Sequence, residues 1–357
     1  MHNLIFFVLI LFSACNNKHK DVIKILWHNN QAKGILIPQA LAGDISADSI
    51  SRYILIRSAA DSSSTTILGN YKISSEGILF EPLIPFSRGS TYEVFSRDKR
   101  ISLVQIPLAN ASDAPVLVSV YPTKDTVPEN MLKIYLQFSK PMREGESAKY
   151  ISLIKNDRDT LHDVFLDLQP ELWNEERTVI TIWLDPGRIK RDLQPNRRLG
   201  NPLKKGEHYK LAISGQWQDV QGLRLKKEFA KKIFVGLRDS ISPDPGQWDL
   251  NIPEKGTIKP LEINLKEPLD YFLLKETISI TNENGNPVKG KVAILNKEIM
   301  IRFTPSSPWI SGNYTLVIET RLEDLAGNNI NRPFDRDIKN SKTPGTKTVF
   351  ERLFTVK

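Results

Sequence analysis

The chain has 357 residues, of which 40% are hydrophobic and 25% are charged, so it is long enough for two or three domains and is not a disordered chain. The formal net charge is +8, with Lys and Arg spread through the sequence, which is typical of solvated faces or of attraction to anionic lipids and acidic polymers. No motif that reads nucleic-acid grooves or stacks bases is present, so nucleic acid is not an expected partner.

The first element is an apolar run of eleven residues, LIFFVLILFSA, which ends directly before Cys15. This run is too short to span a bilayer and has the length of a signal-peptide core. The stretch FSAC resembles the lipobox of bacterial lipoproteins, in which the Cys is lipidated and becomes the mature N-terminus. The match departs at Phe12, where Leu is usual, and no Lys or Arg precedes the run. The alternative is an ordinary apolar N-terminal segment.

We therefore expect a signal peptide over residues 1–14 and a lipidated Cys15 with a tether over residues 15–20. The lipid, such as palmitate, would attach the chain to a membrane. Because Cys15 is the single Cys, the mature domains would contain no disulfide and must be stabilised by their cores. Asn16, not Asp, follows Cys15, and the resemblance then implies an outer-membrane lipoprotein whose periplasmic or surface face stays open.

Three sequence elements recur in one order along the rest of the chain. The first is an alternating apolar run followed by Pro, in ILIPQAL (35–41), LQFSKPM (136–142) and INLKEPL (263–269). The second contains Pro, Gly and Tyr, in LFEPLIPFSRGSTY (79–92) and FTPSSPWISGNY (303–314), and is split between WLDP (183–186) and NPLKKGEHY (201–209). The third is DVQGL (219–223) and DLAGN (324–328), which predicts a turn.

The second element predicts a corner between two sheets. Pro stiffens the crossing, and Gly adopts a positive φ where the chain tightens. A Tyr that starts the next strand can hydrogen-bond back to the corner backbone, as in the tyrosine corner of β-sandwiches. The predicted corner residues are Gly89, Gly206, Gly312, Tyr92, Tyr209 and Tyr314.

Short alternating runs separated by turn residues fill the chain between these elements. Seven of them lie after residue 243, namely WDLNI, LEINL, ISITN, KVAIL, EIMIRF, YTLVIE and RLFTV. The pattern predicts an all-β protein of tandem immunoglobulin-like β-sandwiches, of which we expect three.

FSKPM (138–142), the Gly-x-Tyr corner and DLAGN together resemble the bacterial Ig-like repeats of cell-surface and S-layer proteins. That resemblance implies a sandwich fold in an extracytoplasmic setting and no particular reaction. The expected domains span residues 21–110, 113–238, with an inserted loop over 187–200, and 243–357. The first matches most weakly, because no Asp-x-x-Gly turn follows Tyr92 at the expected distance.

The inserted loop is the best candidate for a binding surface. Aligning ITIWLDP with IMIRFTP places Trp183 opposite Arg302, on the outward face of a strand, so Val179, Thr181 and Trp183 are expected to form an exposed stripe beside the basic loop. The predicted ligand or partner surface consists of Trp183, Arg188, Lys190, Arg191, Arg197 and Arg198. The alternative is that the insertion folds over Trp183 and buries it.

Calcium is the one metal that the sequence suggests, and no other cofactor is expected. Asp324, Asn328, Asp335 and Asp337 supply oxygen ligands on loops near one domain end. The alternative is an acidic turn that is satisfied by its own backbone. Thiolate sites are excluded if Cys15 carries the lipid, and the His residues do not pair at ligand spacing.

No catalytic motif is present, so the predicted function is that of a non-enzymatic envelope lipoprotein that presents Ig-like domains to an envelope protein or a glycan. One alternative is a carbohydrate-binding accessory subunit of an enzyme or transporter, which would need a row of exposed aromatic side chains. A second is a hydrolase that uses Asp185 and Asp192 at the insertion, where no His is present.

Overall fold

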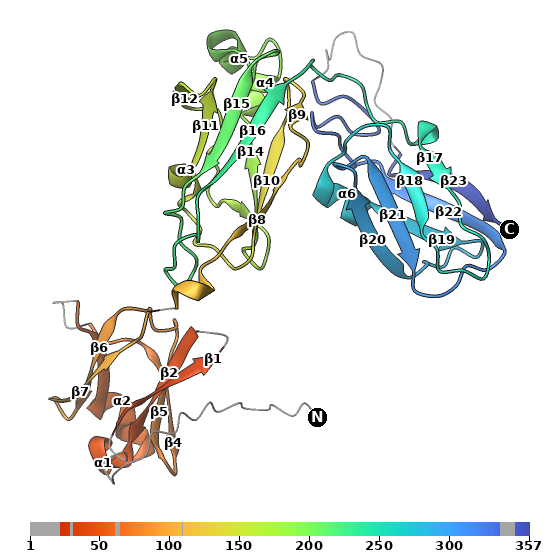
Figure 1. The fold of residues 1–357 in the computed structure, drawn as a ribbon. Helices are drawn as coiled ribbons and strands as arrows, with labels where there is room; N and C mark the ends of the chain where they lie inside the picture. Colours follow the sequence, from red (N-terminus) through yellow and green to blue (C-terminus); the bar gives the residue numbers. More distant parts are fainter. Residues whose placement is uncertain (1–21, 29–30, 61–64, 109, 336–346) are drawn as a thin grey trace. The chain divides into compact units, whose positions relative to one another are not determined.

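The computed structural model describes residues 22–28, 31–60, 65–108, 110–335 and 347–357 (Figure 1). The predicted signal peptide, Cys15 with its tether, and Asp337 lie outside these residues. The chain divides into two compact units, Met1–Asp113 and Ala114–Lys357. Strands dominate the described residues and the longest helix has seven residues, which confirms the all-β class. None of the helices in these ranges is long and apolar enough to cross a membrane.

The first unit packs two antiparallel sheets around one core, with strand orders β1-β2-β5-β4 and β3-β6-β7 (Figure 1). Alternate residues of β2 and β3, such as Ile35, Ile37, Ile54 and Ile56, point into this core and are fully buried. The elements are β1 (Lys24–His28), β2 (Gln31–Pro38), α1 (Gln39–Ala42), α2 (Ile50–Tyr53), β3 (Ile54–Ser58), β4 (Gly69–Ser74), β5 (Gly77–Pro82), β6 (Thr91–Ser96) and β7 (Lys99–Gln105).

The second unit begins with a sandwich of a four-stranded sheet, β13-β14-β10-β8, and a five-stranded sheet, β12-β11-β15-β16-β9. All of its strand pairs are antiparallel except β16 and β9. The predicted insertion forms two short helices, α4 and α5. The elements are β8 (Leu117–Tyr121), β9 (Thr126–Val127), β10 (Lys133–Phe138), α3 (Ser147–Tyr150), β11 (Ile151–Lys155), β12 (Asp159–Leu161), β13 (Leu172–Trp173), β14 (Val179–Trp183), α4 (Pro186–Ile189), α5 (Gln194–Leu199), β15 (His208–Ile213) and β16 (Phe229–Val235).

A further sandwich completes the second unit, with antiparallel sheets β17-β18-β21-β20 and β19-β22-β23. Its seven strands coincide with the seven predicted alternating runs. The sequence pattern did not predict helix α6, which lies between the second and third strands of this set, β18 and β19. The elements are β17 (Asp249–Asn251), β18 (Leu261–Asn264), α6 (Tyr271–Thr277), β19 (Ile278–Asn282), β20 (Gly290–Leu295), β21 (Met300–Pro305), β22 (Gly312–Glu319) and β23 (Val349–Val356).

Each of the three corners ends in a buried Tyr whose hydroxyl returns to the corner backbone. The hydroxyl of Tyr92 accepts from the backbone N–H of Ser87 at 2.9 Å, and that of Tyr209 accepts from Lys204 at 3.0 Å. The hydroxyl of Tyr314 accepts from the N–H of residue 310 at 3.2 Å. Gly89 and Gly206 have φ of 77° and 81°, where a side chain would be strained, and φ of Gly312 is 153°.

The first and third repeated elements lie against each other, which explains why they recur together. Met142 bridges to Asp219, and Leu269 bridges to Asp324, in the two sandwiches of the second unit. In each turn one carboxylate oxygen accepts two backbone N–H groups, at 2.8 and 2.9 Å. Both carboxylates are buried, so the hydrogen bonds that close each Asp-x-x-Gly turn are shielded from solvent.

Replacing Tyr314 by Phe removes the corner hydrogen bond without changing the shape of the core. We expect Tyr314→Phe to destabilise the second unit by about 1 kcal/mol in urea denaturation. Tyr150→Phe is the control, because the hydroxyl of Tyr150 makes no hydrogen bond within the described part of the chain. Equal stability changes for the two variants would show that the corner bond contributes nothing.

Candidate functional site

Helix α6 covers part of the outer face of the β13-β14-β10-β8 sheet. Its residues Tyr271 and Phe272 pack against an aromatic patch on that face. The rings of Tyr121 and Tyr271 stack with centroids 3.7 Å apart and planes inclined by 16°. The second and third sandwiches therefore meet through a buried interface, which we call the junction and define by Tyr121, Lys133, Tyr135, Asp270 and Tyr271.

Trp183 lies on the same outer face and is half-buried. It packs against the core of its sandwich, and the Lys133 ammonium lies 5.4 Å from its ring centroid. The predicted exposed stripe of Val179, Thr181 and Trp183 is therefore wrong, since Val179 is buried at the junction. Register alignment identified the correct face of the strand, but it could not show that α6 covers part of that face.

A buried polar network holds the aromatic contact in place. The Asp270 carboxylate caps α6 by accepting from the N–H groups of residues 272 and 273, at 3.1 and 3.0 Å. Its other oxygen accepts from the Tyr135 hydroxyl at 2.6 Å and lies 3.2 Å from Lys133 Nζ. Lys133 also pairs with Glu323 at 2.7 Å. Burial lowers the pKa of Lys133, but the two carboxylates raise it by more, so Lys133 stays charged.

Further hydrogen bonds join the two sandwiches beside this network. The N–H of Leu132 donates to the carbonyl of Leu325 at 2.9 Å. The Asn130 side chain exchanges two hydrogen bonds with the backbone of Asp239, in the segment that links the sandwiches. The buried Glu298 carboxylate accepts from the N–H and hydroxyl of Thr123. These contacts fix the position of one sandwich on the other from several directions.

The inserted loop does not form one open basic surface, because its most buried basic residue, Arg188, bonds to the protein backbone. Arg188 is buried, and its guanidinium donates to the backbone carbonyls of Asp163, Leu199 and Gly200, at 2.7 to 3.4 Å. The prediction that Arg188 faces a ligand is therefore wrong. The side chain holds α4 and α5 together, because a planar guanidinium can satisfy several carbonyls at once.

The other predicted basic residues divide into two groups. Arg191 pairs with Asp335 at 2.9 Å, and Lys190 Nζ lies 4.4 Å from the ring centroid of Phe334. Arg197 and Arg198 are exposed on α5, where Arg197 makes only a 3.7 Å pair with Asp192. The predicted surface is thus separated: Arg197 and Arg198 are exposed on α5, whereas Arg191 is exposed but paired with Asp335.

Of the predicted calcium ligands in the described part of the chain, Asp324 and Asn328 are in contact, but their polar atoms and those of Asp335 are used by other protein groups. Asp335 is occupied by Arg191 and Arg238. The side-chain amide of Asn328 donates to Asp324 at 2.7 Å, and its oxygen accepts from residue 334. The carboxylates that gather around Asp324 are instead those of Asp239 and Glu267, with one oxygen from each within 4.8 Å of the others. Asp239, Glu267 and Asp324 are therefore the residues whose carboxylate oxygens could bind a divalent cation.

Burial changes the acidity of this carboxylate cluster. Desolvation raises the pKa of Asp324 to about 8, and the nearby Asp239 adds to the rise. Desolvation also raises the pKa of Glu267 to about 7, again with a contribution from Asp239. Neighbouring carboxylates at this distance cannot all ionise without cost, so near neutral pH the cluster retains protons unless a cation replaces them.

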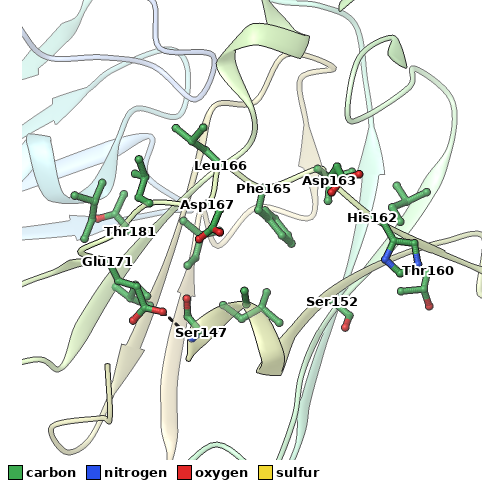
Figure 2. Close-up of a pocket in the computed structure, with 18 residues that line it drawn as sticks. Ser147, Ser152, Thr160, His162, Asp163, Phe165, Leu166, Asp167, Glu171 and Thr181 are labelled. Atoms are coloured by element: carbon green, nitrogen blue, oxygen red, sulfur yellow. Dashed lines mark hydrogen bonds between the residues drawn. The ribbon is translucent and has the colours of Figure 1, made fainter. Parts of the chain in front are cut away.

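A cavity of about 410 Å³ opens where the two sheets of the second sandwich part (Figure 2). It lies between β11 and β12 on one side and β13 and β14 on the other, beside the loop that joins β12 to β13. Its lining is mixed: apolar residues such as Ile151, Phe165 and Ile180 lie beside hydroxyl-bearing residues such as Ser152 and Thr160. Figure 2 shows Phe165 and Asp167 on this loop across from Ser147 of α3. Sequence reasoning missed this site, because no motif marks it.

The rim of this cavity is acidic. Asp163, Asp167 and Glu171 line it, and the only other ionisable lining residue is His162. Glu171 accepts from the N–H groups of residues 145 and 147 and from the Trp173 indole, at 2.7 to 2.8 Å. Burial raises the pKa of Glu171, but these hydrogen bonds lower it by more, so the carboxylate is ionised at neutral pH.

Comparison with protein families concerns the third sandwich. Residues 240–340 match the model of a family described as a bacterial Ig-like domain. The resemblance drawn from the repeated elements is thereby confirmed for this part of the chain. A search of curated proteins found no match to the sequence.

Several solved structures of low sequence identity are similar. One is the N-terminal part of the bacterial S-layer protein SbsC, at 13% identity and a TM-score of 0.24, over 69% of this chain and 45% of that one. Another is alpha-2-macroglobulin from Escherichia coli, domains MG0-NIE-MG1, at 8% identity and a TM-score of 0.24, over 68% and 72%. Titin domains I67–I69 match at 10% identity and a TM-score of 0.20, over 85% and 86%. At these scores none of them supports an inference about activity.

Removing the cation of the junction should destabilise the second and third sandwiches together. Lys133→Met leaves the Asp270 and Glu323 carboxylates without their partner, and we expect a loss of about 3–5 kcal/mol. Urea denaturation of the full chain measures this. Lys149→Met is the control, because its pair with Glu146 is exposed and contributes about 0–1 kcal/mol. Similar losses in both variants would contradict the importance of the network.

The carboxylate cluster should make stability depend on pH. The folded pKa values of Glu267 and Asp324 lie above their usual values, so their stabilising contribution is present at low pH and is lost as pH rises toward about 7 to 8. We expect the melting temperature of the second unit to fall between pH 5 and about pH 8 in metal-free buffer. Glu267→Gln should flatten this fall, whereas the exposed Glu254→Gln should not.

The same pH series, repeated with calcium, distinguishes stabilisation of this cluster by protons from stabilisation by a bound cation. If the cluster binds calcium, adding calcium at high pH should raise the melting temperature of the wild type and leave that of Glu267→Gln unchanged. A flat pH profile for the wild type would contradict the raised pKa values.

Proposed function

We propose that this protein is a non-enzymatic lipoprotein of the bacterial cell envelope that presents Ig-like sandwiches to a partner. The observation that carries the proposal is the buried junction between the second and third sandwiches. A junction with stacked rings, a shared ion network and backbone hydrogen bonds resists bending more than a flexible linker does. Such a pair is suited to holding one surface in a fixed position.

The match of residues 240–340 to bacterial Ig-like domains supports an envelope location and a non-catalytic role. The lipobox-like FSAC at Cys15 supports attachment through lipid to a membrane, with the outer membrane as the proposed site.

The alternatives of the sequence analysis find less support among the described residues. Exposed Trp and Phe side chains in this part of the chain are Trp27 and Phe234, which do not form a row for stacking a glycan. The Asp185 carboxylate caps α4 by accepting from Gly187 at 2.8 Å, and Asp192 is exposed on the loop. No observation favours a hydrolytic pair at the insertion.

The first experiment tests the anchor. Cells expressing the wild type or Cys15→Ala are labelled with a palmitate analogue, fractionated and treated with external protease. We expect the wild type to be labelled and membrane-bound, and Cys15→Ala to be unlabelled and released. Protease access then assigns the periplasmic or the surface face.

Asn16→Asp is the matched control for this experiment, because it keeps the Cys while changing the residue that the resemblance links to sorting. It should remain labelled but shift away from the outer membrane. An unlabelled wild type would overturn the lipid-anchored part of the proposal and leave a secreted or otherwise tethered protein.

A further inference from the structure

The cavity of the second sandwich lies next to a free strand edge. Strand β12 pairs with β11 on one side through residues 159–161. No backbone hydrogen bond joins its other side to anything within the described residues. An unpaired edge of this kind can accept an added strand, and a pocket beside it selects the side chain of that strand.

The length of β12 limits what the edge can contribute. Three residues provide few main-chain hydrogen bonds, so an added strand needs a side-chain anchor as well. The cavity offers that anchor, because its volume of about 410 Å³ falls in the range of small ligand pockets. The apolar part of its lining, which includes Ile151, Phe165 and Ile180, would bury methylene or methyl groups.

The charge around the cavity indicates which side chain fits. The three acidic lining residues, Asp163, Asp167 and Glu171, face no Lys or Arg in the lining. Asp167 is exposed, and among the described residues its carboxylate accepts one hydrogen bond, from the side-chain amide of Gln169 at 3.5 Å. The chain as a whole has a formal net charge of +8, so this group of acidic residues is opposite in sign to the net charge of the chain. A long basic side chain matches both features, with an aliphatic stem for the interior and a cation for the rim.

We propose that β12 and the cavity beside it bind an extended basic segment of a partner protein, with a Lys or Arg side chain inserted into the cavity. This inference rests on the proposed function and names the chemistry of its partner. The segment adds a short strand to β12, and its cation lies near Asp167 at the cavity rim.

The test uses labelled heptapeptides of alternating Val and Thr with a central Arg or a central Glu, and fluorescence anisotropy with the full purified chain. We expect the Arg peptide to bind about tenfold more tightly than the Glu peptide, by charge complementarity at the rim. Amide hydrogen exchange of residues 159–161 should slow when the Arg peptide is bound.

Matched variants locate the site. Asp167→Asn should weaken binding of the Arg peptide about threefold to tenfold, whereas Asp192→Asn, an exposed Asp outside the cavity, should not. Ala148→Trp, at the cavity lining on α3, should block binding. Lys149→Trp, its neighbour outside the lining, should bind normally. Unchanged melting temperatures confirm that the variants are folded.

Three outcomes would overturn the proposal: no binding of the Arg peptide up to about 5 mM, equal binding of both peptides, or binding that the cavity variants do not weaken. Butylguanidinium is the remaining probe. If it binds in the cavity while the Arg peptide does not, the site accepts a small cation and not a strand. These measurements use purified protein, so they are independent of the result at Cys15.

Discussion

The Asp270 carboxylate is the group on which the arrangement of the second unit most depends. It caps α6, accepts from Tyr135 and faces Lys133, so one buried side chain serves the helix and the junction together. Without its cap the short helix would lose the N–H partners of its first turn, and Tyr271 would have no rigid support against Tyr121. The buried charges of Asp270 and Glu323 in turn require the ammonium of Lys133.

The Asp-x-x-Gly turn has different surroundings in the two sandwiches of the second unit. Asp219 and Asp324 each accept from the backbone N–H groups two and four residues further along the chain, and both are buried. Only Asp324 also lies beside the carboxylates of Asp239 and Glu267. The turn of the third sandwich is thus part of a carboxylate cluster, whereas, among the described residues, the turn of the second sandwich is not. The cluster includes Asp239, which lies in the segment that links the two sandwiches.

The junction and the cavity involve different residues of the second sandwich. One sheet face is covered by α6 and fixes the neighbouring domain. The cavity beside β12 and β13 is lined by no residue of α6 and contains both apolar and acidic side chains. One sheet of the second sandwich thus positions the third sandwich, and the proposed site for a partner segment lies at the cavity.

The sequence by itself determined the class of fold, the order of the strands in the last sandwich and the corner hydrogen bonds of Tyr92, Tyr209 and Tyr314. These are local, because alternation sets which side chains face the core, as Ile301 and Phe303 do, and turn residues set where a strand ends. Only the tertiary structure decided how far Trp183 and Arg188 are buried and which carboxylates lie beside Asp324. The same is true of the cavity beside β12. Each of these depends on residues far apart in the chain, and alternation within one strand carries no information about what packs on its outer face.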